Sequence, residues 1–168
     1  NIVSAWHAES GELVDGDWPL TVSTSWYDSI AAPPVLADLD GDGDSEILVG
    51  MDGTDATSDG LHAIQGDGSF LWQRRYSIEG PVAVADLDQD GDVEIALCGY
   101  GPGMSRVYTY ILDHNGQMIK KWQGGSVKGV VAADVDLDGQ GDVIVATQDS
   151  VQALALDGSL LWSTGIDA

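Results

Sequence analysis

Apolar residues occur along this chain in short runs, and turns rich in Asp and Gly separate the runs. In the middle of the sequence, four such runs lie near residues 82–85, 94–98, 107–111 and 117–122. Short runs that are rich in β-branched and aromatic residues and bounded by turn formers predict β-strands. Because no segment shows a sustained helical period, the pattern predicts an all-β chain.

Tight turns join the third and fourth predicted strands of each group. The turn dipeptides are Asp67-Gly68, Asn115-Gly116 and Asp157-Gly158. Such dipeptides tolerate the positive φ angles of hairpin turns. Each group of four runs is therefore predicted to form a four-stranded antiparallel meander.

The pattern recurs at a fixed interval. The stretches that begin at the lead aspartates Asp38, Asp86 and Asp134 share the same alternating acidic residues and apolar flanks, and both intervals are 48 residues. Four strands in about 40 to 50 residues is the size of one β-propeller blade. The repeat therefore predicts consecutive blades.

The chain holds three and a half predicted blades within a single β-propeller segment. Residues 31–78, 79–126 and 127–168 form one blade each, and residues 1–30 form a half blade and its connection. In the half blade, residues 4–14 resemble a third strand, a Ser10-Gly11 turn and a fourth strand. A closed propeller needs at least about four blades. The segment is therefore either part of a larger propeller or completed by other chains.

Two kinds of residue in the predicted strands are expected to be core. Trp72, Trp122 and Trp162 recur in the last strand of each blade, where bulky rings can fill the space between neighbouring sheets. Cys98, the single cysteine, lies in an apolar run and is expected to be a small core residue rather than a reactive thiol.

Charge restricts the partners of this chain. It carries 28 acidic and 6 basic residues, a formal net charge of −22, with 43% apolar content. The apolar content indicates a folded protein rather than an acidic tail. The charge argues against nucleic acid and anionic membrane surfaces, since phosphates would be repelled. No apolar run is long enough to span a membrane. A cation is the natural counterpart.

The acidic residues concentrate in three loops with the pattern D-x-D-x-D-G-x-x-[DE]. The candidate ligand positions are Asp38, Asp40, Asp42, Asp44 and Glu46 in the first loop, Asp86, Asp88, Asp90, Asp92 and Glu94 in the second, and Asp134, Asp136, Asp138, Gln140 and Asp142 in the third. Alternate carboxylates on a chain that turns at glycine can converge on one point. Clustered carboxylates repel one another, whereas Ca²⁺ prefers six to eight such oxygens.

Position seven is the only ligand position that varies in charge, with Gln140 in place of Asp44 and Asp92. That variation is expected if this position contributes its backbone carbonyl, as in other looped calcium sites. An EF-hand begins with the same letters, but it requires a glutamate at position twelve and flanking helices. Position twelve is Val49, Leu97 and Val145 here. The EF-hand interpretation therefore fails in all three loops.

Catalysis is not expected from these carboxylates. A glycosidase uses two carboxyl groups in different environments across a cleft, whereas these clusters are equivalent copies. His7, His62 and His114 do not recur in register and show no metal or triad spacing. We therefore expect a protein that is not an enzyme.

The repeats resemble the FG-GAP family, the calcium-binding repeats of integrin α-subunit propellers and their bacterial, VCBS-type relatives. The resemblance rests on PPVLADLDGDGDSEILVG, GPVAVADLDQDGDVEIALCG and KGVVAADVDLDGQGDVIVAT. It implies one Ca²⁺ in each loop, held in the first by Asp38, Asp40, Asp42, the Asp44 carbonyl and Glu46. The Phe-Gly signature is missing and two loops end in Glu, which points to a bacterial-type repeat.

These inferences predict a secreted or cell-surface, calcium-stabilised propeller module for adhesion or for binding a glycan or protein. One alternative is a structural subunit of a ring or filament whose blades are completed by neighbouring chains through their open edges. Another is the accessory propeller of a larger polysaccharide-degrading enzyme. Variable loops lie at 51–60, 99–106 and 147–150, opposite the acidic loops. A partner is therefore expected near Trp26, Tyr27, Tyr76 and Tyr100.

Overall fold

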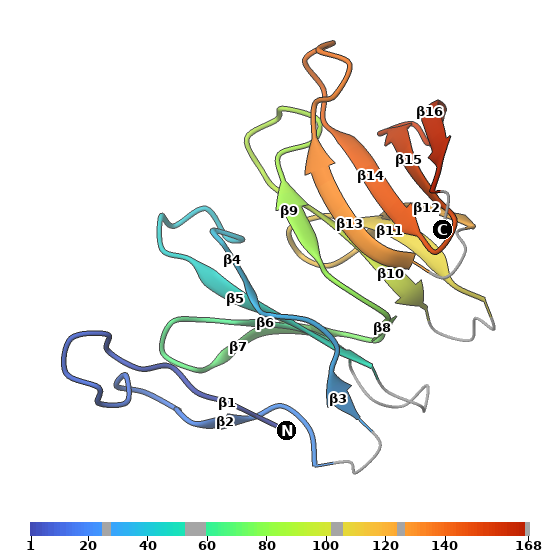
Figure 1. Ribbon diagram of the computed structural model, residues 1–168. Coiled ribbons are helices and arrows are strands. Elements are labelled where there is room, and N and C mark those ends of the chain that lie inside the picture. Colours follow the sequence, from blue (N-terminus) through green and yellow to red (C-terminus); the bar gives the residue numbers. More distant parts are fainter. Residues whose placement is uncertain (25–27, 53–59, 102–105, 124–126, 167–168) are drawn as a thin grey trace.

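The computed structural model describes residues 1–24, 28–52, 60–101, 106–123 and 127–166. Within these ranges the chain forms sixteen β-strands and no helix, which confirms the prediction of an all-β chain. The strands form four antiparallel sheets, and none of the four closes on itself (Figure 1). None of the described residues forms a helix long and apolar enough to cross a membrane.

The first sheet, here called the N-terminal sheet, pairs β1 (Ile2–Val3) with β2 (Leu20–Thr21). Sheet I contains β3 (Ser29–Ile30), β4 (Val35–Ala37), β5 (Glu46–Asp52), β6 (Leu61–Ile64) and β7 (Phe70–Arg74). Sheet II contains β8 (Ser77–Ile78), β9 (Ala83–Ala85), β10 (Glu94–Tyr100), β11 (Tyr108–Leu112) and β12 (Met118–Gln123). Sheet III contains β13 (Val127–Ala133), β14 (Asp142–Thr147), β15 (Ser150–Ala155) and β16 (Leu160–Gly165).

The main strands of sheets I to III follow one another as meanders, β4 to β7, β9 to β12 and β13 to β16. The four main strands of sheet II, β9 to β12, coincide, within two residues at each end, with the runs near 82–85, 94–98, 107–111 and 117–122. Residues 4–14 contain the predicted turn but no strand on either side of it: Trp6 and Leu13 form an isolated bridge, Val14 donates its N–H to the Ala5 carbonyl, and Gly11 has a φ of 70°. The sequence pattern therefore located the main strands of sheet II correctly.

Proline explains why the first strand is interrupted in sheets I and II but continuous in sheet III. In sheet I, β3 and β4 both pair with β5, and the gap between them contains Pro33 and Pro34. In sheet II, Pro81 lies in the gap between β8 and β9. Proline has no N–H to donate to a strand ladder. Sheet III has Lys128-Gly129 there instead, and β13 runs through with a register shift between Val127 and Gly129.

The hairpins between the last two strands use glycine alone for the positive φ angle. The φ angles of Gly68, Gly116 and Gly158 are 87°, 72° and 87°. Each of these glycines donates its N–H to the carbonyl three residues earlier, and a register shift follows in the strand pair. The preceding Asp or Asn keeps a negative φ. The turns are therefore hairpins with a glycine bulge rather than turns with two positive φ angles.

The core lies between consecutive sheets, and each inner sheet is buried on both faces. In β10, Ile95 and Leu97 belong to the apolar cluster shared with sheet I, whereas Ala96 and Cys98 belong to the cluster shared with sheet III. A third cluster joins sheet I to the N-terminal sheet through Trp18. Because side chains alternate between faces along a strand, a continuous apolar run supplies both clusters. Cys98 is buried as predicted, and burial raises the pKa of its thiol to about 11.

Tryptophan rings connect each sheet to the hairpin of the next. The Trp18 indole donates its N–H to the Gly66 carbonyl at 2.9 Å, and the Trp72 indole donates to the His114 carbonyl at 3.0 Å. These two carbonyls occupy equivalent places in the hairpins of sheets I and II. Trp122 packs between sheets II and III, but its buried indole N–H has no hydrogen-bond partner within the described ranges.

Trp162 departs from the prediction that every repeated tryptophan packs between sheets. Its side chain is 42% exposed. The reason is topological: among the described residues no further sheet follows sheet III.

Two matched substitutions test the tryptophan contacts. Trp72→Phe and Trp122→Phe remove similar ring volume, but only the first removes a hydrogen bond. We expect Trp72→Phe to lower the free energy of unfolding by about 1 kcal/mol more than Trp122→Phe. Urea denaturation followed by tryptophan fluorescence measures the difference, and equal losses would contradict the assigned role of the Trp72 hydrogen bond.

Candidate metal centres

The three acidic loops connect the first two main strands of sheets I to III, and they lie on the same side of these sheets (Figure 1). Each loop is closed at its base by a strand pair. The pairs are Ala37 with Glu46, Ala85 with Glu94 and Ala133 with Asp142. The residue before each lead aspartate thus faces the acidic residue at position nine. The ladder therefore fixes both ends of every loop.

Backbone N–H groups inside each loop orient the aspartates. In the first loop, Asp38 Oδ2 accepts the N–H of Gly43 at 3.0 Å, and the φ of Gly43 is 95°. Gly91 and Gly139 donate to Asp86 and Asp134 in the same way, each at 3.1 Å. The positive φ favours glycine at this position. Glycine therefore lets the loop turn back on itself so that its backbone N–H reaches the carboxylate of the lead aspartate.

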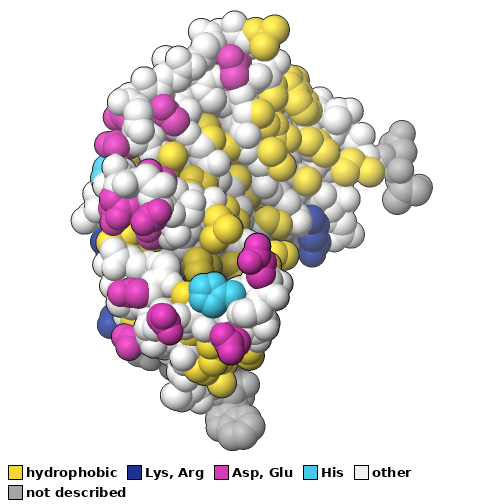
Figure 2. All heavy atoms as spheres, turned by 90° about the vertical axis from the view of Figure 1, so that its left-hand side faces the viewer, with side chains coloured by type: hydrophobic (Ala, Val, Ile, Leu, Met, Phe, Trp, Pro, Cys, Tyr) yellow, Lys and Arg dark blue, Asp and Glu magenta, His cyan; other side chains and the backbone are white. Residues whose placement is uncertain are grey.

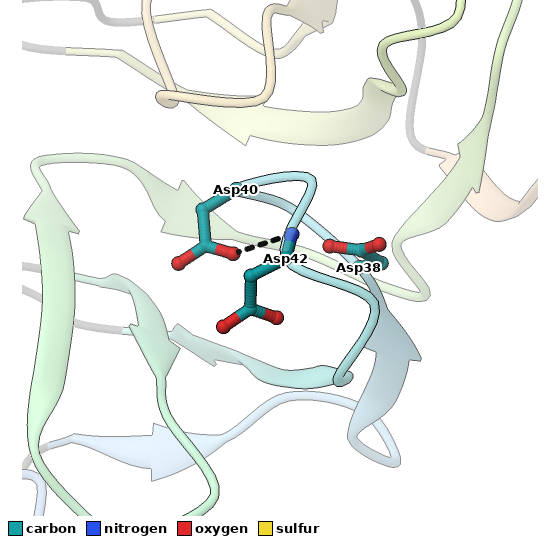
Figure 3. A group of neighbouring side chains, drawn as sticks. All are labelled: Asp38, Asp40 and Asp42. Carbon is teal, nitrogen blue, oxygen red and sulfur yellow. Dashed lines mark hydrogen bonds between the residues drawn. The ribbon is translucent and has the colours of Figure 1, made fainter.

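The next two aspartates continue the pattern. Asp40 Oδ1 accepts the N–H of Asp42 (Figure 3). Asp42 Oδ1 accepts the N–H of Asp44 at 2.8 Å. The second and third loops repeat both hydrogen bonds at the equivalent positions. The residue at position seven donates its backbone N–H to the aspartate at position five, and its side chain takes no part in this hydrogen bond. This is compatible with the predicted carbonyl role of position seven.

Carboxylate oxygens converge in all three loops. One oxygen from each of three residues lies within 4.8 Å of the other two; the groups are Asp38, Asp40 and Asp42, then Asp86, Asp88 and Asp90, then Asp134, Asp136 and Asp142. Ca²⁺ binds oxygens at about 2.3 to 2.6 Å, so two of its ligands are at most about 5 Å apart. The separations therefore fit one ion for each loop.

The acidic residue at position nine is buried in each loop. One oxygen of Glu46 accepts the N–H of Leu39 at 2.7 Å, and Glu94 accepts that of Leu87 at the same distance. Asp142 accepts the N–H of Val135 at 2.9 Å. In the third loop, Asp142 takes part in the converging group, whereas Asp138 does not.

The pKa of the acidic residue at position nine is raised in the first two loops. Burial raises the pKa of Glu46, the hydrogen bond from Leu39 opposes that rise, and the neighbouring Asp40, Asp42 and Asp38 add to it. Burial likewise raises the pKa of Glu94. A bound divalent cation that prefers hard oxygen ligands would stabilise the charged form of both carboxylates and so lower both pKa values. The donor set therefore fits Ca²⁺.

Adjacent loops contact each other, which the sequence pattern did not predict. The Gln89 side-chain amide in the second loop donates to the Gly139 carbonyl in the third. In return, the Gly141 N–H donates to the Leu87 carbonyl at 2.7 Å. A β-carbon added to Gly141 would lie 2.4 Å from Leu87 Cδ2, so glycine allows this close approach. Two hydrogen bonds therefore link the second acidic loop to the third.

His114 also lies close to an acidic loop. Its Nδ1 atom is 3.6 Å from Asp92 Oδ2, at position seven of the second loop. The hairpin between β11 and β12 carries the histidine. The sequence did not predict this contact, because His7 and His62 do not occupy positions equivalent to His114 in the repeat.

The predicted partner surface is resolved only in part. Trp26 and Tyr27 lie outside the described residues. Tyr76 is partly buried and packs edge-on against Tyr110, with ring centroids 5.0 Å apart. The Glu79 carboxylate beside Tyr100 raises the pKa of that phenol. Tyr76 therefore has a packing role in addition to any role in recognition.

Acidic side chains clearly outnumber basic ones on the surface in Figure 2, in keeping with the net charge of −22. The fold and the loops define the class: an all-β protein built from antiparallel meanders, each with an acidic loop that can hold a metal ion. Residues 38–97 match the model of the FG-GAP-like repeat, which confirms the resemblance to that family over this segment. It contains the first two acidic loops.

Solved structures extend the comparison. A protein of unknown function from Bacteroides caccae is 18% identical and matches with a TM-score of 0.55, over 100% of this chain and 55% of that protein. This likeness concerns the fold alone, and the chain spans about half the length of that protein. The V. cholerae biofilm matrix protein Bap1 is 22% identical, with a TM-score of 0.37 over 79% of this chain and 28% of Bap1. No curated protein sequence matches the chain.

The contact between the second and third loops is testable with two glycines. Gly141→Ala places a methyl group against Leu87, whereas Gly129→Ala meets only Ala146 Cβ, at 3.8 Å. We expect Gly141→Ala to lower the free energy of unfolding by about 1 to 3 kcal/mol through overpacking, and Gly129→Ala to have a smaller effect. Thermal melting of both variants checks the difference. A Gly141→Ala melt equal to that of the parent would refute the contact.

Proposed function

We propose that this chain is a calcium-stabilised, extracellular β-propeller segment that serves adhesion or the binding of a glycan or protein. The segment comprises a half blade in residues 1–30 and blades in residues 31–78, 79–126 and 127–168. One observation carries the proposal: three loops repeat the same hydrogen bonds and each brings three carboxylate oxygens within 4.8 Å of one another. We propose no catalytic activity and no nucleic-acid partner.

The proposed role of the ion is structural. It would neutralise each acidic loop and hold the first main strand of a blade to the second, across the pair that closes the loop. Affinities of about 10⁻⁴ to 10⁻³ M suffice for extracellular calcium modules. The three loops share the hydrogen bonds that the N–H groups at positions five, six and seven donate to their aspartates, which supports a scaffold role rather than a catalytic pair of carboxylates in unlike environments.

The adhesive or binding role is proposed from the scaffold. The acidic loops gather at one side of the sheets, which leaves the loops at the opposite ends of the strands free to vary. Assignment as the accessory propeller of a polysaccharide-degrading enzyme is a further proposal, which the sequence of the parent protein would test. In both cases the partner would meet the module outside the cell.

Calcium removal is the first test. In 10 mM Ca²⁺, a site with a dissociation constant of about 10⁻³ to 10⁻⁴ M stabilises the folded state by about 1.4 to 2.7 kcal/mol. We expect the melting temperature to fall by several degrees when excess EDTA replaces Ca²⁺. Mg²⁺ should restore less of the loss, because it demands near-ideal octahedral geometry. Equal melting temperatures in Ca²⁺ and EDTA would rule the proposal out.

A substitution in one loop tests the number of sites. Asp86→Asn keeps an oxygen that can accept the Gly91 N–H but removes the carboxylate charge. Titration calorimetry should then find two bound Ca²⁺ instead of three. Asp15→Asn is the matched control, since Asp15 is exposed and lies outside the loops. The proposal fails if both variants bind the same number of ions.

A further inference from the structure

The second acidic loop, residues 86–94, and the third, residues 134–142, touch each other directly. The Gln89 side-chain amide donates to the Gly139 carbonyl, and the Gly141 N–H donates to the Leu87 carbonyl at 2.7 Å, so each loop is donor in one hydrogen bond and acceptor in the other. A β-carbon added to Gly141 would lie 3.0 Å from Leu87 Cα, so the two backbones are in close contact.

The first of these hydrogen bonds reaches the carboxylates of the third loop. Gln89 is bonded to the oxygen of the peptide group that joins Gly139 to Gln140. The N–H of the same peptide group donates to Asp138 at 2.8 Å, and the Gly139 N–H donates to the lead Asp134 at 3.1 Å. The Gln89 amide therefore helps to orient a peptide group that itself orients the aspartate at position five.

The second hydrogen bond reaches the buried carboxylate of the second loop. Gly141 directly precedes Asp142, the acidic residue at position nine of the third loop, and it donates to the Leu87 carbonyl. The Leu87 N–H in turn donates to Glu94, at position nine of the second loop, at 2.7 Å. A change in the conformation of either loop therefore displaces groups that orient carboxylates in the other.

The first and second loops lack this contact. Position four, where the second loop has Gln89, is Gly41 in the first loop, and a β-carbon added there would meet nothing within 4 Å. Position eight, where the third loop has Gly141, is Val93 in the second loop, and Val93 packs against the apolar cluster between sheets I and II. Residues 38–46 and 86–94 are all described, and no hydrogen bond joins these two loops.

We propose that the second and third loops bind Ca²⁺ with positive cooperativity, and that the first loop lacks this coupling. This rests on the proposed function, because it takes each loop to hold one ion. An ion that closes the second loop would fix Leu87 and Gln89 in place. The third loop would then lose less conformational entropy when it closes on its own ion. The effect is reciprocal, since each site must raise the affinity of the other by the same factor.

Electrostatic repulsion acts on both pairs of neighbouring loops and has the opposite sign. An ion in one loop makes the potential at the next loop less negative, which weakens binding there. Salt screens this effect, whereas it leaves a contact between backbones in place. The pair of the first and second loops is therefore an internal reference, which experiences the charge effect without the contact.

Titration calorimetry in about 0.15 M NaCl, an ionic strength at which the Debye length is about 8 Å, measures the coupling. Alanine at position three disables one site, because it removes a ligand; in each loop it also removes one hydrogen bond of 3.2 to 3.3 Å. The variants are Asp40→Ala, Asp88→Ala and Asp136→Ala. Single variants keep two sites and double variants keep one. The coupling factor is the binding constant for two ions divided by the product of the two single-site constants.

We expect the coupling factor in Asp40→Ala, which keeps the second and third sites, to be about five times that in Asp136→Ala, which keeps the first and second. Equal factors overturn the cooperativity, while the single-site constants still establish calcium binding. Absence of binding in every variant overturns the proposed function as well. The difference should persist in about 0.5 M NaCl; a difference that salt abolishes is electrostatic and contradicts the role of the contact.

Two matched substitutions in the Asp40→Ala chain assign the coupling to the contact. Gln89 and Leu137 both occupy position four, with φ angles of 61° and 64°, and both are exposed. Glycine relieves the same backbone conformation in each case, but only Gln89→Gly removes a hydrogen bond to another loop. Gln89→Gly should at least halve the coupling factor, and Leu137→Gly should leave it unchanged. Equal factors in these two variants overturn the role of Gln89.

Discussion

Burial of both faces of each sheet is the constraint on which this structure depends. A strand such as β10 carries apolar residues at consecutive positions, so one sheet exposes two apolar faces and cannot be stable alone. Consecutive sheets solve the problem by packing face against face, with Cys98 and Leu97 on opposite sides of one strand. The stack itself, rather than any single sheet, is the folding unit.

The strand ladder closes each acidic loop between an alanine and the acidic residue at position nine, and that acidic residue is buried in all three loops. A buried carboxylate surrounded by aspartates is unfavourable without a partner. The backbone N–H of Leu39 satisfies one oxygen of Glu46, and a cation is the remaining partner that the donor set favours. Fold and proposed calcium binding thus share one origin.

Several features could be read from the sequence because they depend on local periodicity. The strands of sheet II, the hairpin glycines and the converging aspartates all follow from residue type and spacing within one repeat. The contact of Gln89 with Gly139 and the approach of His114 to Asp92 could not be read in that way. They join residues from different strands or repeats, and no local spacing encodes which side chains meet across a sheet interface.

The sequence by itself determined the all-β class, the three loops and the glycine positions, because strand alternation and turn geometry act over a few residues. Only the tertiary structure decided which tryptophans are covered. Trp72 and Trp162 occupy equivalent positions in their strands, yet one is buried and the other is exposed. The difference arises because burial of a sheet face depends on whether another sheet follows, which is a property of the assembled stack.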